Sequence, residues 1–203
     1  MLYILGLTGG ISSGKSEASK IFSEFGYTVI ETDKIAHEMY LKGTDIYEAV
    51  INFFGKNILK KNSEIDRSKL GAIVFYDKKK LSFLQNLIWP EVIKIIEDKI
   101  SVSKKNRERI FVIESHLIFE SGIKNLMNEI WTIESSEQLQ MERLVDYRGL
   151  SLDYAKQIIS VQNDSLFRKK KSDKVIENTN ELFMFRNKII KLINKLENKL
   201  NSE

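Results

Sequence analysis

The feature that most constrains this chain is a glycine-rich loop near its start that fits the pattern G-x-x-x-x-G-K-[ST]. An apolar run, residues 2–7, precedes the loop and suits a strand buried on both faces. After the loop, apolar residues recur at helical spacing until Gly26, the residue type that commonly ends a helix. Strand, glycine loop and helix form the context in which this pattern binds phosphate, so an accidental glycine turn is disfavoured. The loop consists of Gly9, Gly10, Ile11, Ser12, Ser13, Gly14, Lys15 and Ser16.

Each fixed position of this pattern has a physical role. The glycines let the backbone turn tightly and bring its N–H groups close to phosphate oxygens. Lys15 carries a positive charge on a stem long enough to reach the β- and γ-phosphates, and Ser16 offers a hydroxyl to Mg²⁺. The helix that begins here directs the positive end of its dipole at the same anion. The loop therefore predicts a nucleoside triphosphate site.

The composition indicates a globular protein. The chain has 203 residues, of which 42% are hydrophobic and 30% charged, with a net charge of +4. The absence of cysteine excludes disulfides and thiolate-bound metals. No apolar run reaches the roughly eighteen residues that a membrane span needs, so we expect a cytoplasmic protein without a membrane partner. Basic clusters at 78–80 and 168–171 are typical of solvated faces, and we expect no nucleic-acid partner.

Strand and helix patterns alternate along the chain. After the first strand, further strand candidates are residues 27–32, 109–115, 129–134 and 173–178, and helical patterns separate them. This alternation predicts an α/β fold with a five-stranded parallel sheet flanked by helices. Asp33 follows the second strand, at the sheet edge where ligands of parallel sheets bind. It suits either a catalytic role or the cap of the next helix, and the two roles are compatible.

The remaining segments are predicted to be helical. Residues 44–104, in which Pro90 is expected to open the third helix, suit a helical insertion that covers a substrate. Ser135 and Gln138 have capping-box spacing and predict a helix start. A helical lid is expected at about 136–165, with a helix from Ser151 to Gln162 within it. The last helix carries an apolar stripe expected to pack on the sheet, and no linker divides the 1–203 domain.

The loop alone leaves three classes of enzyme. A GTPase would carry an Asn-Lys-x-Asp motif, which is absent from the sequence. Asp146 and Gly149 have D-x-x-G spacing but lie late in a predicted helix, so the match is accidental. The chain is short for an ATPase motor and no apolar strand ends in Asp-Glu. A small-molecule kinase fits best.

The sequence resembles the dephospho-CoA kinases over nearly its whole length, from about residue 5 to 178. The ordered set of matches is far more specific than the glycine loop alone. The residues that carry it are Gly6 to Ile11 with Gly14-Lys15-Ser16, Gly26 to Ile30 with Asp33, Ile35 and Ala36, Phe54-Gly55, Asp66-Arg67, Leu70, Val74-Phe75, Pro90, Leu117 to Glu120, Gln140, Arg143-Leu144, Gly149 to Ser151, Gln162, Asp173, Val175-Ile176 and Asn178.

The resemblance implies a P-loop kinase fold with a helical CoA-binding region and a lid. It implies ATP- and Mg²⁺-dependent phosphorylation of the ribose 3′-hydroxyl of dephospho-CoA, the last step of coenzyme A synthesis. Asp33 matches the acid proposed to accept the hydroxyl proton, and Lys15 and Arg143 are the other catalytic candidates. The nucleotide site would extend from Gly9 to Glu17, with Ser16 as metal ligand. Thr8, Asp33 and Arg148 are the candidates for substrate binding.

The chain departs from the family pattern at several positions, which concern rate and acceptor specificity more than nucleotide binding. Tyr147-Arg148 stands where the family has Arg-Asp, which displaces one lid arginine by a residue. Two alternatives therefore stay open: a P-loop kinase for another nucleoside or nucleotide, and a nucleotide-binding regulatory module. A monomer or weak homo-oligomer is expected, and the preference for ATP over GTP stays open. The other departures are Glu17, Glu31, Trp89, Glu114 and His116.

Overall fold

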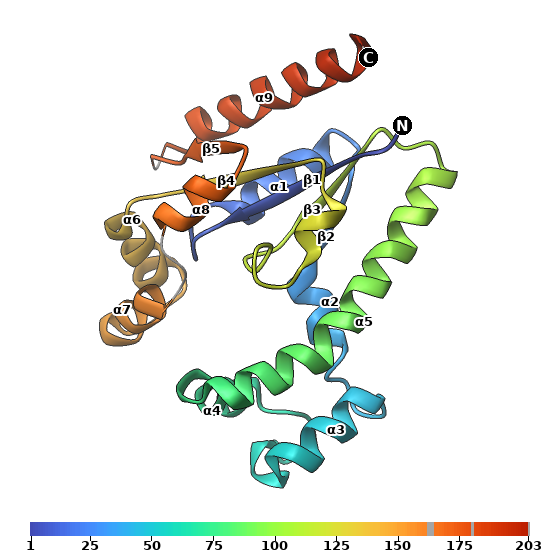
Figure 1. The fold of residues 1–203 in the computed structure, drawn as a ribbon. Helices are drawn as coiled ribbons and strands as arrows, with labels where there is room; N and C mark the ends of the chain where they lie inside the picture. The colour runs from blue at the N-terminus through green and yellow to red at the C-terminus, as the bar shows by residue number, and fades with distance from the viewer. Residues whose placement is uncertain (162–164, 180, 203) are drawn as a thin grey trace. The chain divides into compact units, whose positions relative to one another are not determined.

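The structure is a computed structural model that describes residues 1–161, 165–179 and 181–202, without the side chains of Phe75 and Val161. The chain divides into two compact units, one made of 1–30 with 103–203 and the other of 31–102. Figure 1 shows the path of the chain through its strands and helices. The helical character expected for 44–104 is present, and the second unit begins earlier, so that it includes Asp33.

The first unit is built on a parallel sheet with strand order β2-β3-β1-β4-β5. The strands are β1 (Tyr3–Gly9), β2 (Thr28–Glu31), β3 (Ile110–Glu114), β4 (Glu129–Glu134) and β5 (Lys174–Glu177). In the central register Leu7 lies opposite Glu114 on one side and Trp131 on the other. The fold class expected from the sequence, a five-stranded parallel sheet flanked by helices, is confirmed.

Two helices cover one face of this sheet. Helix α1 (Lys15–Glu24) and helix α9 (Leu182–Ser202) bury their apolar stripes against alternate residues of the strands. Phe22 of α1 packs against Trp131, with ring centroids 5.8 Å apart. The apolar stripe of the last helix therefore packs on the sheet as expected. The stripe consists of Phe185, Ile189, Ile193 and Leu196.

The remaining helices of the first unit follow β3 and β4. A short turn η2 (Ile123–Leu126) precedes β4. After β4 come α6 (Glu137–Glu142), a π-helical turn η3 (Arg143–Tyr147), α7 (Leu152–Val161) and α8 (Ser165–Lys171). The predicted helix end at Gln162 lies outside the described residues. Helix α8 had no counterpart in the sequence-based expectation.

The cap predicted at Ser135 is wrong by one residue. Ser136 is the N-cap of α6, and its side chain accepts a hydrogen bond from the main-chain N–H of Leu139. The Ser135 hydroxyl instead donates to the carbonyl oxygens of Ser13 and Asn178. These tertiary contacts take Ser135 out of the capping position, and the helix begins one residue later.

The second unit consists of helices α2 (Thr32–Glu38), α3 (Asp45–Phe54), η1 (Lys56–Ile58), α4 (Arg67–Tyr76) and most of α5 (Lys78–Lys105). The N-cap of α2 is Glu31, so the capping role considered for Asp33 is wrong, and Asp33 lies exposed in the first turn. Thr44 and Asp66 cap α3 and α4 through their side chains. These caps satisfy main-chain N–H groups that lack helical partners.

Pro90 does not open a helix, as the sequence suggested, but lies inside α5. Proline removes one main-chain hydrogen bond from a helix interior and is costly there. The cost is offset by an apolar repeat that crosses Pro90 without a change of spacing and keeps one face of α5 buried. The repeat consists of Leu84, Ile88, Val92, Ile96 and Ile100. No helix among the described residues has the length and apolar character that a bilayer crossing requires.

Candidate functional site

The loop between β1 and α1 has a backbone that only glycine can adopt at two positions. Gly9 has φ 153° and Gly14 has φ 110°. A Cβ atom on Gly9 would lie 2.1 Å from the carbonyl oxygen of Ile133, and one on Gly14 would lie 2.4 Å from Asn178 Nδ2. Ser12 also has positive φ, at 53°, a conformation that costs a non-glycine residue free energy. The loop is therefore a strained turn held by its neighbours, as expected where a backbone approaches a ligand.

The ammonium group of Lys15 lies across the start of this loop. Lys15 Nζ donates hydrogen bonds to the carbonyl oxygens of Gly9, at 3.0 Å, and of Gly10, at 2.9 Å. A positive charge is thus held against the main-chain carbonyl groups at the start of the turn. Ser16 follows in the first turn of α1, and its side chain is exposed.

Several hydroxyls of the loop are suited to an anionic ligand. The Oγ1 atom of Thr8 and the Oγ atoms of Ser12 and Ser13 are buried and have no hydrogen-bond partner among the described residues. Unpaired buried hydroxyls cost free energy, which a ligand with acceptor oxygens would recover. Together with the ammonium of Lys15 and the strained glycine turn, these donors fit a polyphosphate chain.

Arg143 contacts the loop from the π-helical turn η3. Its Nη1 donates to the Ser12 carbonyl at 2.8 Å and to Ser135 Oγ at 2.9 Å, and its Nη2 donates to Asn178 Oδ1 at 3.3 Å. Asn178 in turn donates to the Ser13 carbonyl at 2.8 Å. Burial lowers the pKa of the Arg143 guanidinium from its ordinary value. Arg143, Ser135 and Asn178 thus fasten the strained Ser12–Ser13 peptide region to the ends of β4 and β5.

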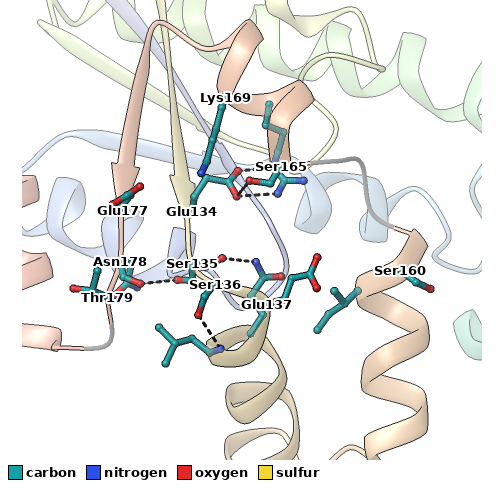
Figure 2. A pocket seen from close by; sticks show the side chains of 14 residues that line it. Glu134, Ser135, Ser136, Glu137, Ser160, Ser165, Lys169, Glu177, Asn178 and Thr179 are labelled. Carbon is teal, nitrogen blue, oxygen red and sulfur yellow. Dashed lines mark hydrogen bonds and ion pairs between the residues drawn. The ribbon is translucent and has the colours of Figure 1, made fainter.

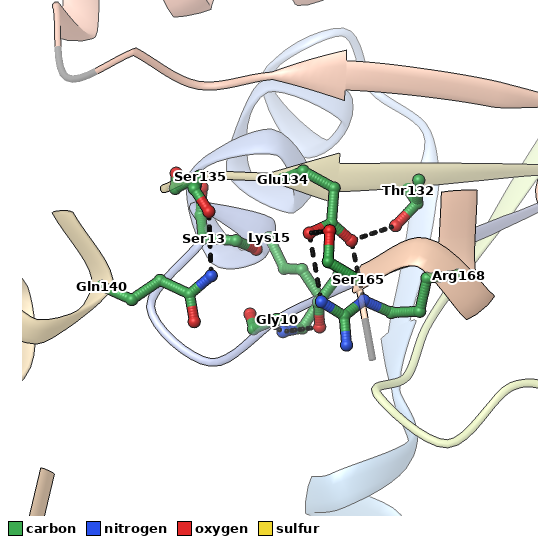
Figure 3. A network of polar contacts seen from close by, with 10 residues as sticks. Gly10, Ser13, Lys15, Thr132, Glu134, Ser135, Gln140, Ser165 and Arg168 are labelled. Carbon is green, nitrogen blue, oxygen red and sulfur yellow. Dashed lines mark hydrogen bonds and ion pairs between the residues drawn. The ribbon is translucent and has the colours of Figure 1, made fainter. Parts of the chain in front are cut away.

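A second arginine lies on the other side of the loop. Arg168 of α8 forms an ion pair with Glu134, the last residue of β4, and both side chains are almost fully buried. A Cβ on Gly10 would lie 3.2 Å from Arg168 Nη2 and 3.0 Å from Gln140 Nε2, so the loop passes close to both. Figure 3 shows this network around Gly10 and Lys15.

A cavity of about 690 Å³ opens next to this network. Its wall combines the end of β4, helices α6, α7 and α8, and the end of β5, as Figure 2 shows. The charged and amide side chains that line it are the cations Arg168 and Lys169, the amides Gln140 and Asn178, and the acids Glu134, Glu137 and Glu177. Its volume suits a nucleotide-sized ligand, since small-molecule sites are typically about 300–1,000 Å³.

The structure brings some of the expected site residues together. Thr8, Lys15 and Arg143 lie with the loop in the first unit, whereas Asp33 belongs to the second unit. Arg148 follows η3 and is exposed, and because η3 is π-helical, ideal α-helical angles between Arg143 and Arg148 do not apply.

The acidic departures from the family pattern have structural partners. Glu17 pairs with Arg186 of α9. Glu114, at the end of β3, accepts a hydrogen bond from Ser19 of α1. Glu134 and Arg168 were missed by sequence reasoning. An acid at the carboxyl end of β4 was the available signal, because ligands bind at this end of parallel strands.

Fold and site together define a P-loop nucleoside triphosphate-binding protein, with a parallel sheet and a lysine-bearing glycine loop that enters a helix. The sequence model of the dephospho-CoA kinase family matches residues 3–183, and the chain belongs to this family. A dephospho-CoA kinase of Carboxydothermus hydrogenoformans is 38% identical over 195 residues, covering 96% of this chain and 95% of the relative. The family expected from the sequence is therefore confirmed.

Solved structures share this fold. A dephospho-CoA kinase from Campylobacter jejuni superposes with a TM-score of 0.71 at 33% identity, covering 97% of this chain and 98% of that one. The protein TT1252 from Thermus thermophilus superposes with a TM-score of 0.80 at 22% identity over 96% and 98% of the two chains. The second likeness concerns the fold alone.

Proposed function

We propose that this protein transfers the γ-phosphoryl group of ATP to the ribose 3′-hydroxyl of dephospho-CoA, which yields coenzyme A and ADP. The observation that carries the proposal is the loop itself, in a chain of this family. Its glycine backbone, the Lys15 ammonium and the buried hydroxyls of Thr8, Ser12 and Ser13 fit a triphosphate. The compartment that suits this activity is the cytoplasm, and a monomer or weak homo-oligomer would suffice for it.

The residues of the site bind the reactants and neutralise phosphate charge, and the proposed reaction has no covalent enzyme intermediate. Lys15 would exchange its two carbonyl partners for the β- and γ-phosphates, and the N–H groups from Gly9 to Glu17 would face the phosphate chain. Mg²⁺, when bound, neutralises charge on the β- and γ-oxygens. Ser16 is the residue proposed to hold this metal, through its exposed hydroxyl.

The transfer forms a bond from the ribose 3′-oxygen to the γ-phosphorus and breaks the bond from that phosphorus to the β–γ bridging oxygen. We assign the proton of the 3′-hydroxyl to the carboxylate of Asp33, which matches the family's acid and is exposed in the first turn of α2. Arg143 is proposed to stabilise the charge of the transferred group. Thr8, Asp33 and Arg148 are proposed to contact the acceptor substrate.

The test is a steady-state assay with ATP, Mg²⁺ and a panel of acceptors that contains dephospho-CoA, nucleosides and nucleotides. Coenzyme A should form with dephospho-CoA, at a kcat/KM well above that for every other acceptor. Faster phosphorylation of another acceptor would identify a different P-loop kinase. ATP binding without turnover on any acceptor would identify a nucleotide-binding regulatory module. A parallel titration with GTP measures the nucleotide preference.

A further inference from the structure

The ion pair between Glu134 and Arg168 holds the Arg168 guanidinium in one orientation. Arg168 Nε lies 2.7 Å from Glu134 Oε1, and Arg168 Nη2 lies 3.0 Å from Oε2. The two side chains are 5% and 3% exposed. Thr132 Oγ1 and Ser165 Oγ also donate to the carboxylate, at 3.1 Å and 2.8 Å. Four hydrogen bonds therefore fix the carboxylate, and a two-point pair fixes the guanidinium against it.

This guanidinium lies beside the start of the phosphate loop. A Cβ on Gly10 would be 3.2 Å from Arg168 Nη2, and the Gly10 carbonyl accepts a hydrogen bond from Lys15 Nζ at 2.9 Å. Gly10 therefore adjoins two cationic groups, one from α1 and one from α8 (Figure 3). Arg168 also lines the cavity of about 690 Å³. Lys169 of the same helix lines it too, as Figure 2 shows.

Stability alone does not explain such a pair. Removing two charges from water is costly, and apolar residues of similar volume are often equally stabilising in the same place. A buried pair with a fixed guanidinium next to a phosphate loop suits anion recognition, because the planar fork of arginine matches phosphate oxygens better than an ammonium does. A fixed cation stabilises the transition state most when it lies where negative charge develops during phosphoryl transfer.

We propose that Arg168 binds the terminal phosphates of the nucleoside triphosphate beside Gly10, and that Glu134 is the positioning residue that orients it. The proposal rests on the nucleotide part of the proposed function and is independent of the acceptor. Arg168 recognises the β- and γ-phosphates, so its contribution increases with the length of the phosphate chain. Lys15 and Arg168 then bind the anion from two different elements, and α8 becomes part of the nucleotide site.

The experiment compares the dissociation constants of ATP, ADP and AMP, measured by calorimetry with Mg²⁺ and without acceptor. The main variant combines Glu134→Met with Arg168→Met, which removes the cation together with the buried carboxylate that pairs with it. ATP should bind about 10- to 100-fold more weakly, the range of one or two charge-assisted hydrogen bonds. AMP should bind as it does to the unaltered protein. Lys170→Met removes an exposed cation from the same helix and should leave all three constants unchanged.

Two further variants separate positioning from folding. Glu134→Gln keeps the shape and Arg168 but weakens the hold on it, and should lower ATP affinity while AMP affinity stays constant. Arg168→Lys keeps the positive charge but loses the planar guanidinium. If the double variant does not fold, this variant is used for the same comparison of ATP and AMP affinities.

The proposal is overturned if the ratio of the ATP and AMP dissociation constants does not change. Equal weakening of both would make the pair structural, and no weakening of either would place Arg168 outside the nucleotide site. Failure of the unaltered protein to bind ATP would instead contradict the proposed function.

Discussion

Arg143 Nη1 donates a 2.8 Å hydrogen bond to the main-chain carbonyl oxygen of Ser12, a residue held in the left-handed region of backbone space at φ 53°. The contact joins the turn that follows α6 to the most strained non-glycine position of the phosphate loop. Because Arg143 also contacts Ser135 and Asn178, the loop is fastened by residues distant in sequence. The shape of the phosphate loop therefore depends on tertiary contacts as well as on its glycines.

Lys15→Ala should abolish most turnover while the fold persists. Lys15 Nζ donates hydrogen bonds to the main-chain oxygens of Gly9 and Gly10, which are neutral acceptors, so we expect the variant to fold. We expect kcat to fall by about 10²–10³, as for other groups directed at transition-state charge. Lys20→Ala, an exposed lysine on the same helix, is the control. Turnover close to that of the unaltered enzyme would remove the loop from the active site.

Gly9→Ala should destabilise the protein, because the new methyl group would lie 2.1 Å from the rigid Ile133 carbonyl at φ 153°. The loss should exceed about 1 kcal/mol, the lower range for backbone strain. Gly71→Ala is the matched control, since Gly71 lies within α4 and a Cβ there meets nothing within 4 Å. It should stabilise by about 0.5–1 kcal/mol. Thermal unfolding should show a lower Tm for Gly9→Ala and a higher Tm for Gly71→Ala. Equal Tm shifts in the two variants would contradict the view that the loop backbone requires glycine at position 9.

The local part of the site could be predicted from the sequence. The glycine pattern predicts the loop, and the flanking apolar runs predict β1 and α1. These predictions succeed because the loop, the strand and the helix are each determined by residues close together in the sequence. β4 was predicted with its observed bounds, Glu129–Glu134. Pro90 misled the prediction, although the four-residue apolar spacing across it was a usable signal of one continuous helix.

Long-range pairings were not accessible from the sequence. Arg168 stands in a run of four basic residues that is typical of a solvated face, and its partner Glu134 is 34 residues away. Ser135 looked like a helix cap, but its hydroxyl is engaged by Ser13 and Asn178. A local pattern describes what a side chain can do, whereas packing between elements decides which of those options it adopts.

Asp33→Asn should lower kcat by about 10²–10⁴, the range for a positioned general base, with ATP affinity nearly unchanged. Asparagine keeps the shape of the side chain but accepts a proton poorly. Glu38→Gln, at another exposed acid of α2, is the control and should have normal turnover. A kcat for Asp33→Asn within twofold of the unaltered enzyme would exclude the carboxylate as the base.

Glu129→Gln should reduce stability at neutral pH more than in acid. Burial alone would raise the pKa of the Glu129 carboxyl, but hydrogen bonds from Tyr3, Trp131 and Lys174 hold that pKa below its usual value. A lowered folded pKa adds stability above the unfolded pKa of about 4.3, and this stability is lost as pH falls through the folded pKa.

The difference in Tm between Glu129→Gln and the unaltered protein should therefore be a few degrees at about pH 7 and should shrink below about pH 4. Glu181→Gln, at an exposed acid, is the control and should show a small Tm difference at both values. A Tm difference for Glu129→Gln that does not change with pH would mean that the Glu129 side chain stabilises the protein by packing and not by its charge.

Arg143→Lys should lower kcat much more than Arg148→Lys. The guanidinium of Arg143 serves the Ser12 carbonyl, Ser135 Oγ and Asn178 Oδ1 at once, and a lysine ammonium lacks the planar fork that reaches them together. Arg148 is exposed at the end of η3, next to Gly149 with φ 65°, and is expected to assist. We expect a loss of about tenfold or more for Arg143→Lys and about twofold or less for Arg148→Lys.

Both arginine variants should still bind ATP, because Lys15 and the loop amides are unchanged in them. Nucleotide titration and steady-state rates on the same preparations separate binding from turnover. Equal and small losses would show that the lid acts through other residues, with the cavity-lining Lys169 as the next candidate. The reverse order of losses would mean that the family alignment is displaced in this segment, and that Arg148 rather than Arg143 carries the role assigned to the lid arginine.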